Sequence, residues 1–193
     1  MRWSACLLLC AATAALAEDV DRLDIGRDGA RYRVALHARL DAPLADSYAV
    51  FADFHNLPKI NDAVEAATPL PSPQAGVERW HTRVRVCVAF FCTHLEQVQD
   101  VRRAQDSSGY RLDASVIPEM SNLRYGQADW QLAACGAQTC LSFNAELEPD
   151  FWVPPLLGPW LIERALRREA HVTAAGIETL AIAHRHTAGT PPP

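Results

Sequence analysis

Four cysteines form the pattern with the most definite chemistry in this chain. They occur as two close pairs, Cys87/Cys92 and Cys135/Cys140, with four residues inside each pair. An even number of closely spaced cysteines in an exported protein indicates disulfides, and we expect each pair to form its own bridge, although four cysteines allow three connectivities. The alternative is a metal site that includes His94. Two such pairs on separate strands do not resemble a zinc site, so we predict no metal.

Residues suited to catalysis do not form a recognisable motif. The sequence contains no Ser-His-Asp order, no glycine-rich phosphate loop and no His-Glu-x-x-His motif. His81 and His94 are predicted on the solvent side of one hairpin, and His171 lies in the last helical segment without an evident partner. We therefore assign no catalytic residue, expect no cofactor and favour binding over catalysis.

Residues 1–17 predict that the protein is exported. Arg2 is followed by an apolar run and by the small-residue ending Ala-Leu-Ala before Glu18. This is the pattern of a secretory signal peptide, and it is shorter than the roughly 18 residues that a membrane span needs. Cleavage near Ala17 would give a periplasmic or secreted protein and would remove Cys6 and Cys10. The formal net charge is −5 and no basic stripe is present, so we expect no nucleic-acid partner.

The rest of the chain predicts one α+β domain at residues 30–186. Residues 18–29 are charged and irregular and indicate a loose lead-in, whereas residues 187–193 indicate a disordered tail. Between them, alternating and helical patterns mark the elements. In chain order we expect a strand at residues 32–40, short helices after Pro43 and at residues 57–61, and strands at residues 63–68 and 109–117.

The cysteine pairs set the register of two hairpins. If Cys87 lies opposite Cys92, opposite charges face each other on one side of the first hairpin and apolar residues on the other, as a half-exposed hairpin needs. The pairs are Arg83 with Glu96, Arg79 with Asp100, Val84 with Leu95, and Val86 with Thr93. The charge match supports this register independently of the cysteines.

The same rule applied to Cys135 and Cys140 aligns the second hairpin. It sets Trp130 opposite Ala145, Leu132 opposite Phe143, and Ala128 opposite Leu147. It also sets Asp129 opposite Glu146, a like-charge pair that this register does not explain. Arg124 would point to the apolar side, unless a bulge in the strand turns it to solvent.

The last long segment predicts an amphipathic helix that begins near Pro159. Its apolar residues recur at three- and four-residue steps, and Glu178 falls among the polar positions. The apolar positions are Leu161, Ala165, Val172, Gly176 and Leu180. A single amphipathic helix must bury its apolar face against another layer, which here can only be the sheet.

Two stretches resemble a known family. The segment F-x-V-P-P-L-L-G-P-W-L-I, and the earlier L-D-A-P-L-A-D-S-Y-A-V-F-A-D-F-H-N-L-P-K-I-N, are similar to the START-like (SRPBCC) helix-grip superfamily, in its polyketide cyclase/dehydrase and coenzyme Q-binding branch. The resemblance covers about residues 32–184. It implies a curved antiparallel sheet of about six to seven strands wrapped around a long C-terminal helix, with two short helices after the first strand. The export signal and the two cysteine pairs depart from the family pattern.

The resemblance also implies an apolar cavity between the sheet and the helix. Core packing is the alternative role for each predicted lining residue. The predicted lining is Trp80, Val84, Tyr110, Leu112, Arg124, Trp130, Phe143, Leu161, Ala165 and Val172. Arg124, if it points inward, could bind a carboxylate or carbonyl of the ligand.

A second set of apolar residues is predicted at the entrance or at a membrane surface. Internal packing under neighbouring loops is the alternative for these residues as well. They are Phe90, Phe91, Phe151, Trp152, Leu156 and Trp160. Tryptophan is physically favoured at a membrane–water boundary, so transient contact with a membrane is one expectation.

These features support three hypotheses. The first is a carrier that holds a lipid-, quinone- or polyketide-like molecule. The second is a cyclase- or dehydratase-type enzyme that uses the same cavity, with Arg124 or Tyr110 as the polar participant. The third is a domain that docks an envelope protein through Phe90, Phe91 and Trp152, with side chains filling the interior.

Overall fold

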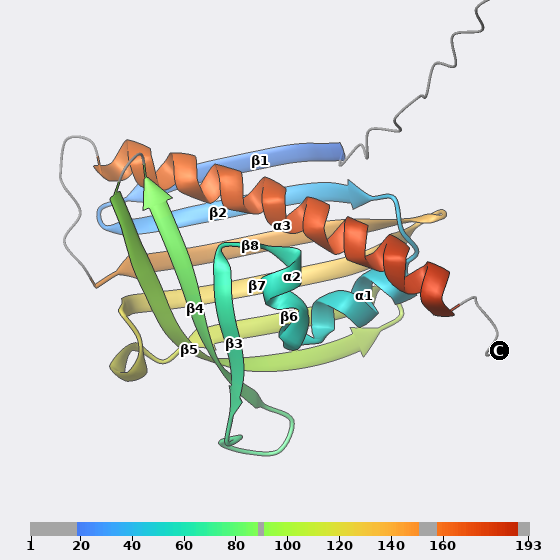
Figure 1. The fold of residues 1–193 in the computed structure, drawn as a ribbon, viewed down its shortest axis with the longest axis horizontal. Coiled ribbons are helices and arrows are strands. Elements are labelled where there is room, and N and C mark those ends of the chain that lie inside the picture. Colours follow the sequence, from blue (N-terminus) through green and yellow to red (C-terminus); the bar gives the residue numbers. More distant parts are fainter. Residues whose placement is uncertain (1–18, 89–90, 151–157, 189–193) are drawn as a thin grey trace, which may run out of the picture.

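The computed structural model describes residues 19–88, 91–150 and 158–188, which form one antiparallel sheet covered by a long helix (Figure 1). The sheet has eight strands in the order β1-β2-β8-β7-β6-β5-β4-β3, so every neighbour except β2/β8 is consecutive in sequence. The strands are β1 (Asp19–Asp28), β2 (Arg31–Leu40), β3 (Val64–Leu70), β4 (Glu78–Val88), β5 (Phe91–Asp106), β6 (Gly109–Val116), β7 (Leu123–Cys135) and β8 (Gln138–Pro149). The helices are α1 (Leu44–Ala52), α2 (Leu57–Ile60), α3 (Gly158–Ala188) and the short 3-10 turns η1 (Phe54–Asn56) and η2 (Pro118–Met120).

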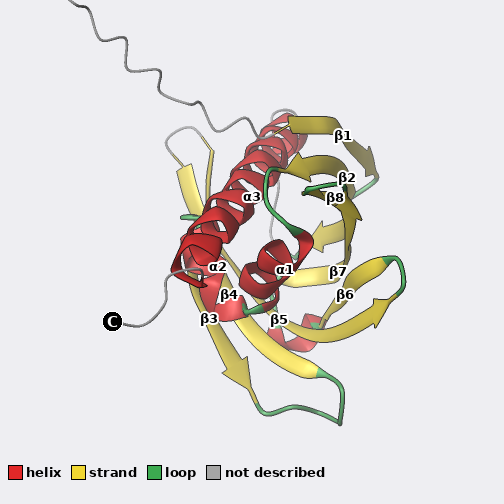
Figure 2. Ribbon diagram, turned by 90° about the vertical axis from the view of Figure 1, so that its right-hand side faces the viewer, coloured by secondary structure: helices red, strands yellow, loops and turns green. Residues whose placement is uncertain are grey.

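The sheet curls around the helical layer. Figure 2 shows it bending from β1 round to β3, with α3 across the open side and α1 between α3 and the strands. Apolar residues at every second position of β2 give this sheet its buried face, as the alternation predicted. The predicted helix-grip architecture is confirmed, with eight strands in place of six to seven.

The additional strand is β1, and the prediction of a loose lead-in at residues 18–29 was wrong over residues 19–28. β1 pairs along its whole length with β2. Two of its aspartates form ion pairs with β2: Asp21 Oδ1 lies 2.6 Å from Arg39 Nη2, and Asp28 Oδ2 lies 3.5 Å from Arg33 Nη2. Leu23 packs against the core from the same strand. The high charge of this segment therefore marks the outer face of an edge strand.

Helix α3 buries a face that is rotated from the predicted one. Its most buried apolar residues are Ala170, Ala174, Ile177 and Ala181, which recur at three- and four-residue steps. Leu161, Ala165 and Val172 are only partly buried, so the predicted stripe lay along the edge of this face. The helix continues to Ala188, and the rest of the predicted tail lies outside the described residues.

Glu178, which was predicted on the polar side of the helix, is buried. Its side chain is 1% exposed, and its Oε2 accepts a hydrogen bond from the backbone N–H of Asp41 at 2.7 Å. The carboxylate thus ties α3 to the end of β2. Nearby, a Cβ on Gly176 would overlap the backbone carbonyl of Ile60, so α2 and α3 approach as closely as glycine allows.

The two hairpins carry the two predicted disulfides, Cys87–Cys92 and Cys135–Cys140. In the first hairpin every predicted cross-strand pair is confirmed, including Arg83 opposite Glu96 and Val84 opposite Leu95. Arg79 also lies opposite Asp100 and bonds to it with Nε–Oδ1 and Nη2–Oδ2 distances of 2.7 and 2.9 Å.

The predicted register of the second hairpin was wrong by two residues. Trp130 lies opposite Phe143, and Cys135 lies opposite Gln138 rather than Cys140. Asp129 therefore faces Asn144, whose Nδ2 donates to Asp129 Oδ1 at 2.9 Å, and the like-charge pair does not form. Because Cys135 and Cys140 are not directly opposed, their disulfide crosses the hairpin diagonally.

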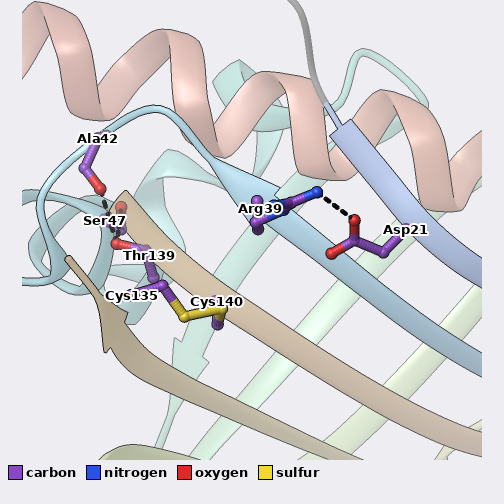
Figure 3. Close-up of a disulfide and its surroundings, with 7 residues drawn as sticks. All are labelled: Asp21, Arg39, Ala42, Ser47, Cys135, Thr139 and Cys140. Atoms are coloured by element: carbon purple, nitrogen blue, oxygen red, sulfur yellow. Dashed lines mark hydrogen bonds and ion pairs between the residues drawn. A yellow bond between two sulfur atoms is a disulfide. The ribbon is translucent and has the colours of Figure 1, made fainter. Parts of the chain in front are cut away.

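The second disulfide lies beside a buried polar junction (Figure 3). Thr139 Oγ1 donates to the carbonyl oxygen of Ala42 at 2.8 Å and lies 3.0 Å from Ser47 Oγ. Both hydroxyl groups belong to side chains that are fully buried. This junction anchors the start of α1 to β8, and the disulfide holds the adjacent strand end in place.

Candidate ligand cavity

A cavity of about 250 Å³ lies between the sheet and α3. Strands β2, β4, β5, β7 and β8 form its walls, and α3 forms its roof through Leu166, Ala170 and Ala174. Ala170 and Ala174 are small, so the roof does not fill the space beneath it. The volume exceeds the roughly 150 Å³ of an engineered cavity that holds benzene.

One wall of the cavity is apolar and aromatic. Trp130 on β7 stacks on Phe143 on β8, with ring centroids 5.0 Å apart. Phe51 from α1 packs on Trp130 with a centroid distance of 5.7 Å. Val34 and Leu36 continue this wall on β2. A ligand ring could extend this aromatic packing at no cost in polar desolvation.

The opposite wall, on β4 and β5, is polar. Thr82 lies opposite Gln97 and Trp80 lies opposite Gln99 in the hairpin register. Thr82, Gln97 and Gln99 all line the cavity. The cavity is therefore amphipathic across the sheet, because its two hairpins supply side chains of different chemistry.

The roof carries a charged group of the main lobe, Glu169. Asn61, which follows α2, donates from Nδ2 to Glu169 Oε2 at 2.9 Å and to Thr173 Oγ1 at 3.0 Å. Its Oδ1 accepts from the backbone N–H of Ala63 at 2.9 Å. Asn61 is buried, and these three bonds use most of its capacity. It thus fixes the position of Glu169 over the cavity.

A second lobe of about 190 Å³ adjoins the first. Both lobes are lined by Gln97, Gln99, Trp130 and Phe143. Ala145 also lines both lobes. The second lobe extends over β6, where Ala114 and Val116 are too small to fill the curve of the sheet. The lobes together offer room for a ligand larger than a single ring.

The outer face of the sheet has a larger but open depression of about 710 Å³. Its charged residues bond to one another: Arg33 Nε lies 2.9 Å from Glu146 Oε1, and Arg111 Nε lies 2.9 Å from Asp113 Oδ1. Such mutually paired surface groups are ordinary for the wet face of a sheet. We therefore take the space beneath α3 as the candidate site.

Three of the ten predicted lining residues face this space: Val84, Trp130 and Phe143. Leu112 is instead fully buried in the core, and Tyr110 stacks on Tyr48 with ring centroids 3.7 Å apart. Trp80 is buried against Phe54, with its Nε1 donating to Glu78 at 3.1 Å.

The helix positions were misassigned for one reason. Leu161, Ala165 and Val172 do not line the cavity, and Leu166, Glu169, Ala170 and Thr173 do. Spacing alone defines the period of an amphipathic helix but leaves its rotation uncertain by about one residue when alanines dominate both sides.

Arg124 does not point inward. A register shift between Leu123 and Tyr125 marks a bulge in β7, and the Arg124 side chain is 65% exposed. Its Nε lies 2.6 Å from Asp150 Oδ1, and this hydrogen bond raises the pKa of Arg124 above its ordinary value. The alternative raised by the sequence, a strand bulge, is the one that forms.

Of the predicted entrance residues, Trp160 has a described side chain. It is 58% exposed, and the guanidinium carbon of Arg164 lies 5.8 Å from its ring centroid. Phe91 pairs through its backbone with Val88. The remaining positions, Phe90, Phe151, Trp152 and Leu156, lie outside the described residues, as do residues 1–17.

Metal and membrane features were also considered within the described ranges. No cluster of three or more potential ligands for a metal ion occurs there. None of the helices in residues 19–88, 91–150 and 158–188 has both the length and the hydropathy of a membrane span.

No family model and no curated protein matches the chain by sequence. Solved structures do match its fold. The Zhui aromatase/cyclase from Streptomyces sp. R1128 superimposes with a TM-score of 0.65 at 16% identity, over 83% of this chain and 99% of that chain. The chain has the START-like helix-grip fold.

Two lipid-transfer proteins share this START-like fold. Human StAR-related lipid transfer protein 5 gives a TM-score of 0.69 at 10% identity, over 84% of this chain and 88% of that chain. A STAR-related lipid transfer protein from Xanthomonas axonopodis gives a TM-score of 0.63 at 12% identity, over 84% of this chain and 99% of that chain. The resemblance inferred from sequence is thus confirmed for the fold, and the low identities leave the cavity residues to be interpreted from this chain alone.

The polar residues of the START-like cavity were missed by sequence reasoning. Thr82, Gln97 and Gln99 lie on the inner side of the first hairpin, where the alternation expected apolar residues. Their placement follows directly from the cysteine register, which sets Thr82 opposite Gln97. Polar residues at inward positions of a correctly aligned hairpin could therefore have predicted a polar cavity wall. Glu169 carried the same kind of signal, because it lies four residues after Ala165 and three before Val172, on the predicted apolar stripe of the helix.

Proposed function

We propose that this chain is an exported binding protein that holds a hydrophobic molecule in the cavity between its sheet and α3. The observation that carries the proposal is the cavity of about 250 Å³, with an aromatic wall and an adjoining lobe, inside an otherwise packed fold. Lipid-transfer proteins and an aromatase/cyclase share this fold, which supports a role that depends on the cavity. Removing apolar ligand surface from water contributes at most about 25 cal/mol per Å².

Export is supported by two separate features. Residues 1–17 have the pattern of a signal peptide, and both cysteine pairs form disulfides. Structural disulfides persist mainly in oxidising compartments such as the periplasm or the extracellular space. The proposed location is therefore periplasmic or secreted.

The enzyme alternative has less support. It predicts at least two titratable groups that converge in the cavity. In the described lining, Glu169 is the ionisable side chain of the main lobe, and Glu146, which lines the second lobe, is bonded to Arg33. Arg124 and Tyr110, the predicted participants, lie elsewhere. The docking alternative requires a filled interior, and the cavity argues against it.

The test combines native mass spectrometry with a cavity-filling variant. Ala145 lines both lobes, so Ala145→Phe should fill their junction, and phenylalanine suits a strand. Protein purified from a bacterial periplasm should carry an apolar molecule that organic extraction removes. The bound fraction should fall about tenfold in Ala145→Phe.

The matched control is Ala134→Phe, an exposed position on β7. It should retain the ligand at the wild-type level. If wild type carries no extractable ligand and takes up no added apolar compound, the binding function is wrong. Equal loss in both variants would mean that the phenylalanine acts on the fold, so the cavity would not be the site.

A further inference from the structure

The polar wall of the cavity contains a buried hydroxyl without a partner. Thr82 is 2% exposed, and its Oγ1 is buried and forms no hydrogen bond with any described residue. Buried polar groups in folded proteins are nearly always hydrogen-bonded, and an unpaired one costs the free energy of its desolvation. This hydroxyl lines the candidate site, so a bound molecule could satisfy it.

Two glutamines flank this hydroxyl. Gln97 lies directly opposite Thr82 on the neighbouring strand, and Gln99 lies two residues further along the same face. Gln99 is 7% exposed. Neither side-chain amide has a hydrogen bond to another residue in the described ranges. An amide both donates and accepts, so the three side chains offer a cluster of unused donors and acceptors.

The charge of the cavity restricts what this cluster can bind. Glu169 lines the same space from α3, and the described lining includes no lysine or arginine. A carboxylate or phosphate inside the cavity would lose its hydration, meet no cation and face the Glu169 carboxylate. A neutral carbonyl or hydroxyl group loses much less hydration, needs no cation and is not repelled by Glu169, and it can bond to Thr82 and the glutamines.

The volume restricts the size of the ligand. The main lobe of about 250 Å³ is less than twice the roughly 150 Å³ that encloses benzene, and the second lobe adds about 190 Å³. A ring system of two or three rings, or a chain of similar size, matches this space. The aromatic wall at Trp130 and Phe143 would hold its apolar part.

We infer that the ligand is a neutral molecule of this size that presents a carbonyl or hydroxyl oxygen to Thr82, Gln97 and Gln99, and that Glu169 discriminates against its carboxylate counterpart. The inference rests on the proposed binding function and adds the ligand class. The polar wall orients the ligand, with its oxygen toward β4 and β5 and its rings toward β7 and β8.

Three related compounds test this inference in equilibrium dialysis against the purified full-length mature protein near pH 7.5. They are naphthalene, 2-acetonaphthone and 2-naphthoate, which share one ring system and differ in the attached group. The ketone should bind about tenfold more tightly than naphthalene, because its oxygen satisfies the polar wall. The carboxylate should bind at least tenfold more weakly than the ketone.

Variants assign the effect to residues. Thr82→Val and Gln99→Leu, which preserve side-chain size, should each lower the ratio of ketone affinity to naphthalene affinity about tenfold. Glu169→Gln should raise the affinity for 2-naphthoate about tenfold and leave Asn61 a carbonyl oxygen to bond. Glu163→Gln, on the same helix but outside the lining, is the control and should leave all three affinities unchanged.

Contrary results separate the two proposals. If naphthalene binds and the ketone binds no more tightly, or if both polar-wall variants leave the ratio unchanged, the inferred ligand class is wrong while the binding function stands. If the carboxylate binds as tightly as the ketone, the role of Glu169 is wrong. If none of the compounds binds up to its solubility limit and the purified protein carries no extractable apolar molecule, the binding function itself fails.

Discussion

The two disulfide-bridged hairpins of this protein share a sequence spacing and differ in geometry. Both have four residues between their cysteines, and their last paired residues are Val88 with Phe91 and Cys135 with Gln138. In the β4–β5 hairpin the cysteines face each other directly, with a Cα–Cα distance of 4.0 Å. In the β7–β8 hairpin they are offset, and the distance is 5.7 Å. Spacing therefore predicts a bridge but does not set the register.

The turn sets the register instead. Gly136 is the first loop residue of the second hairpin and has a φ of 67°, which suits a tight hairpin turn and strains other residues. The turn is therefore displaced from the centre of the cysteine pair. The displacement places Asn144 opposite Asp129. Glu146 lies opposite Arg33 of β2 and bonds to it at 2.9 Å. The like-charge pair that the first alignment left unexplained was the sign of the error.

The hairpins also differ in what they present to the cavity. The β4–β5 hairpin contributes Thr82, Gln97 and Gln99, whereas the β7–β8 hairpin contributes Trp130 and Phe143. One wall stabilises the fold by apolar packing, and the other leaves polar groups unpaired. Stability and recognition are thus divided between two regions that resemble each other in sequence pattern.

The largest expected loss of stability comes from a substitution in the apolar wall. Trp130→Ala should lower the free energy of unfolding by about 3 kcal/mol, because it removes a ring that packs on Phe51 and Phe143. Gln99→Ala in the polar wall should cost about 1 kcal/mol or less, since its amide has no partner to lose. Urea denaturation measures both, and Trp160→Ala is the control, with a change below about 1 kcal/mol for an exposed ring. Equal costs in the two walls would contradict the contrast.

An intermediate effect tests the register. Gly136→Val should lower the free energy of unfolding by about 1–2 kcal/mol, because a β-branched residue is strained at positive φ. Gly26→Val is the matched control, since Gly26 lies in β1 and a Cβ there would meet nothing within 4 Å. It should change stability by less than about 0.5 kcal/mol. Thermal unfolding of the two variants gives the comparison, and a harmless Gly136→Val would argue for a turn placed elsewhere.

The smallest effect concerns the charge pair that distinguishes the first hairpin. The hydrogen bond from Arg79 lowers the pKa of Asp100 below its ordinary value. A lowered folded-state pKa stabilises the protein fully above the unfolded value of about 3.9, and this contribution is lost as the pH falls through the folded-state pKa. Asp100→Asn should therefore cost about 1 kcal/mol near pH 7 and progressively less below about pH 4.

Urea denaturation at a series of pH values measures this dependence. Asp62→Asn replaces an exposed aspartate outside the sheet and should follow the wild-type curve. A constant difference between Asp100→Asn and wild type at every pH would show that ionisation of Asp100 does not contribute.

Much of the architecture followed from local patterns. Alternation in residues 32–40 and the prolines at 43 and 159 indicated which segments form the first inner strand and the helices, because side-chain period and proline geometry are local properties. The cysteines indicated both bridges, and charge matching confirmed the first register. Strand β1 was not predicted, because its many charged residues lack the apolar alternation of a strand. It forms as an edge strand because it pairs with β2.

The cavity depends on contacts between segments that are distant in the sequence. Whether Ala170 and Ala174 or Ala165 and Val172 face the sheet depends on the rotation of α3. That rotation is set where Gly176 meets Ile60 and Glu178 binds Asp41. The amphipathic pattern specifies a face only to within about one residue, and packing between layers selects among nearly equivalent rotations. The sequence was therefore sufficient for the kind of fold and for its bridges. The volume beneath the helix, its polar wall and the outward turn of Arg124 arise from tertiary packing.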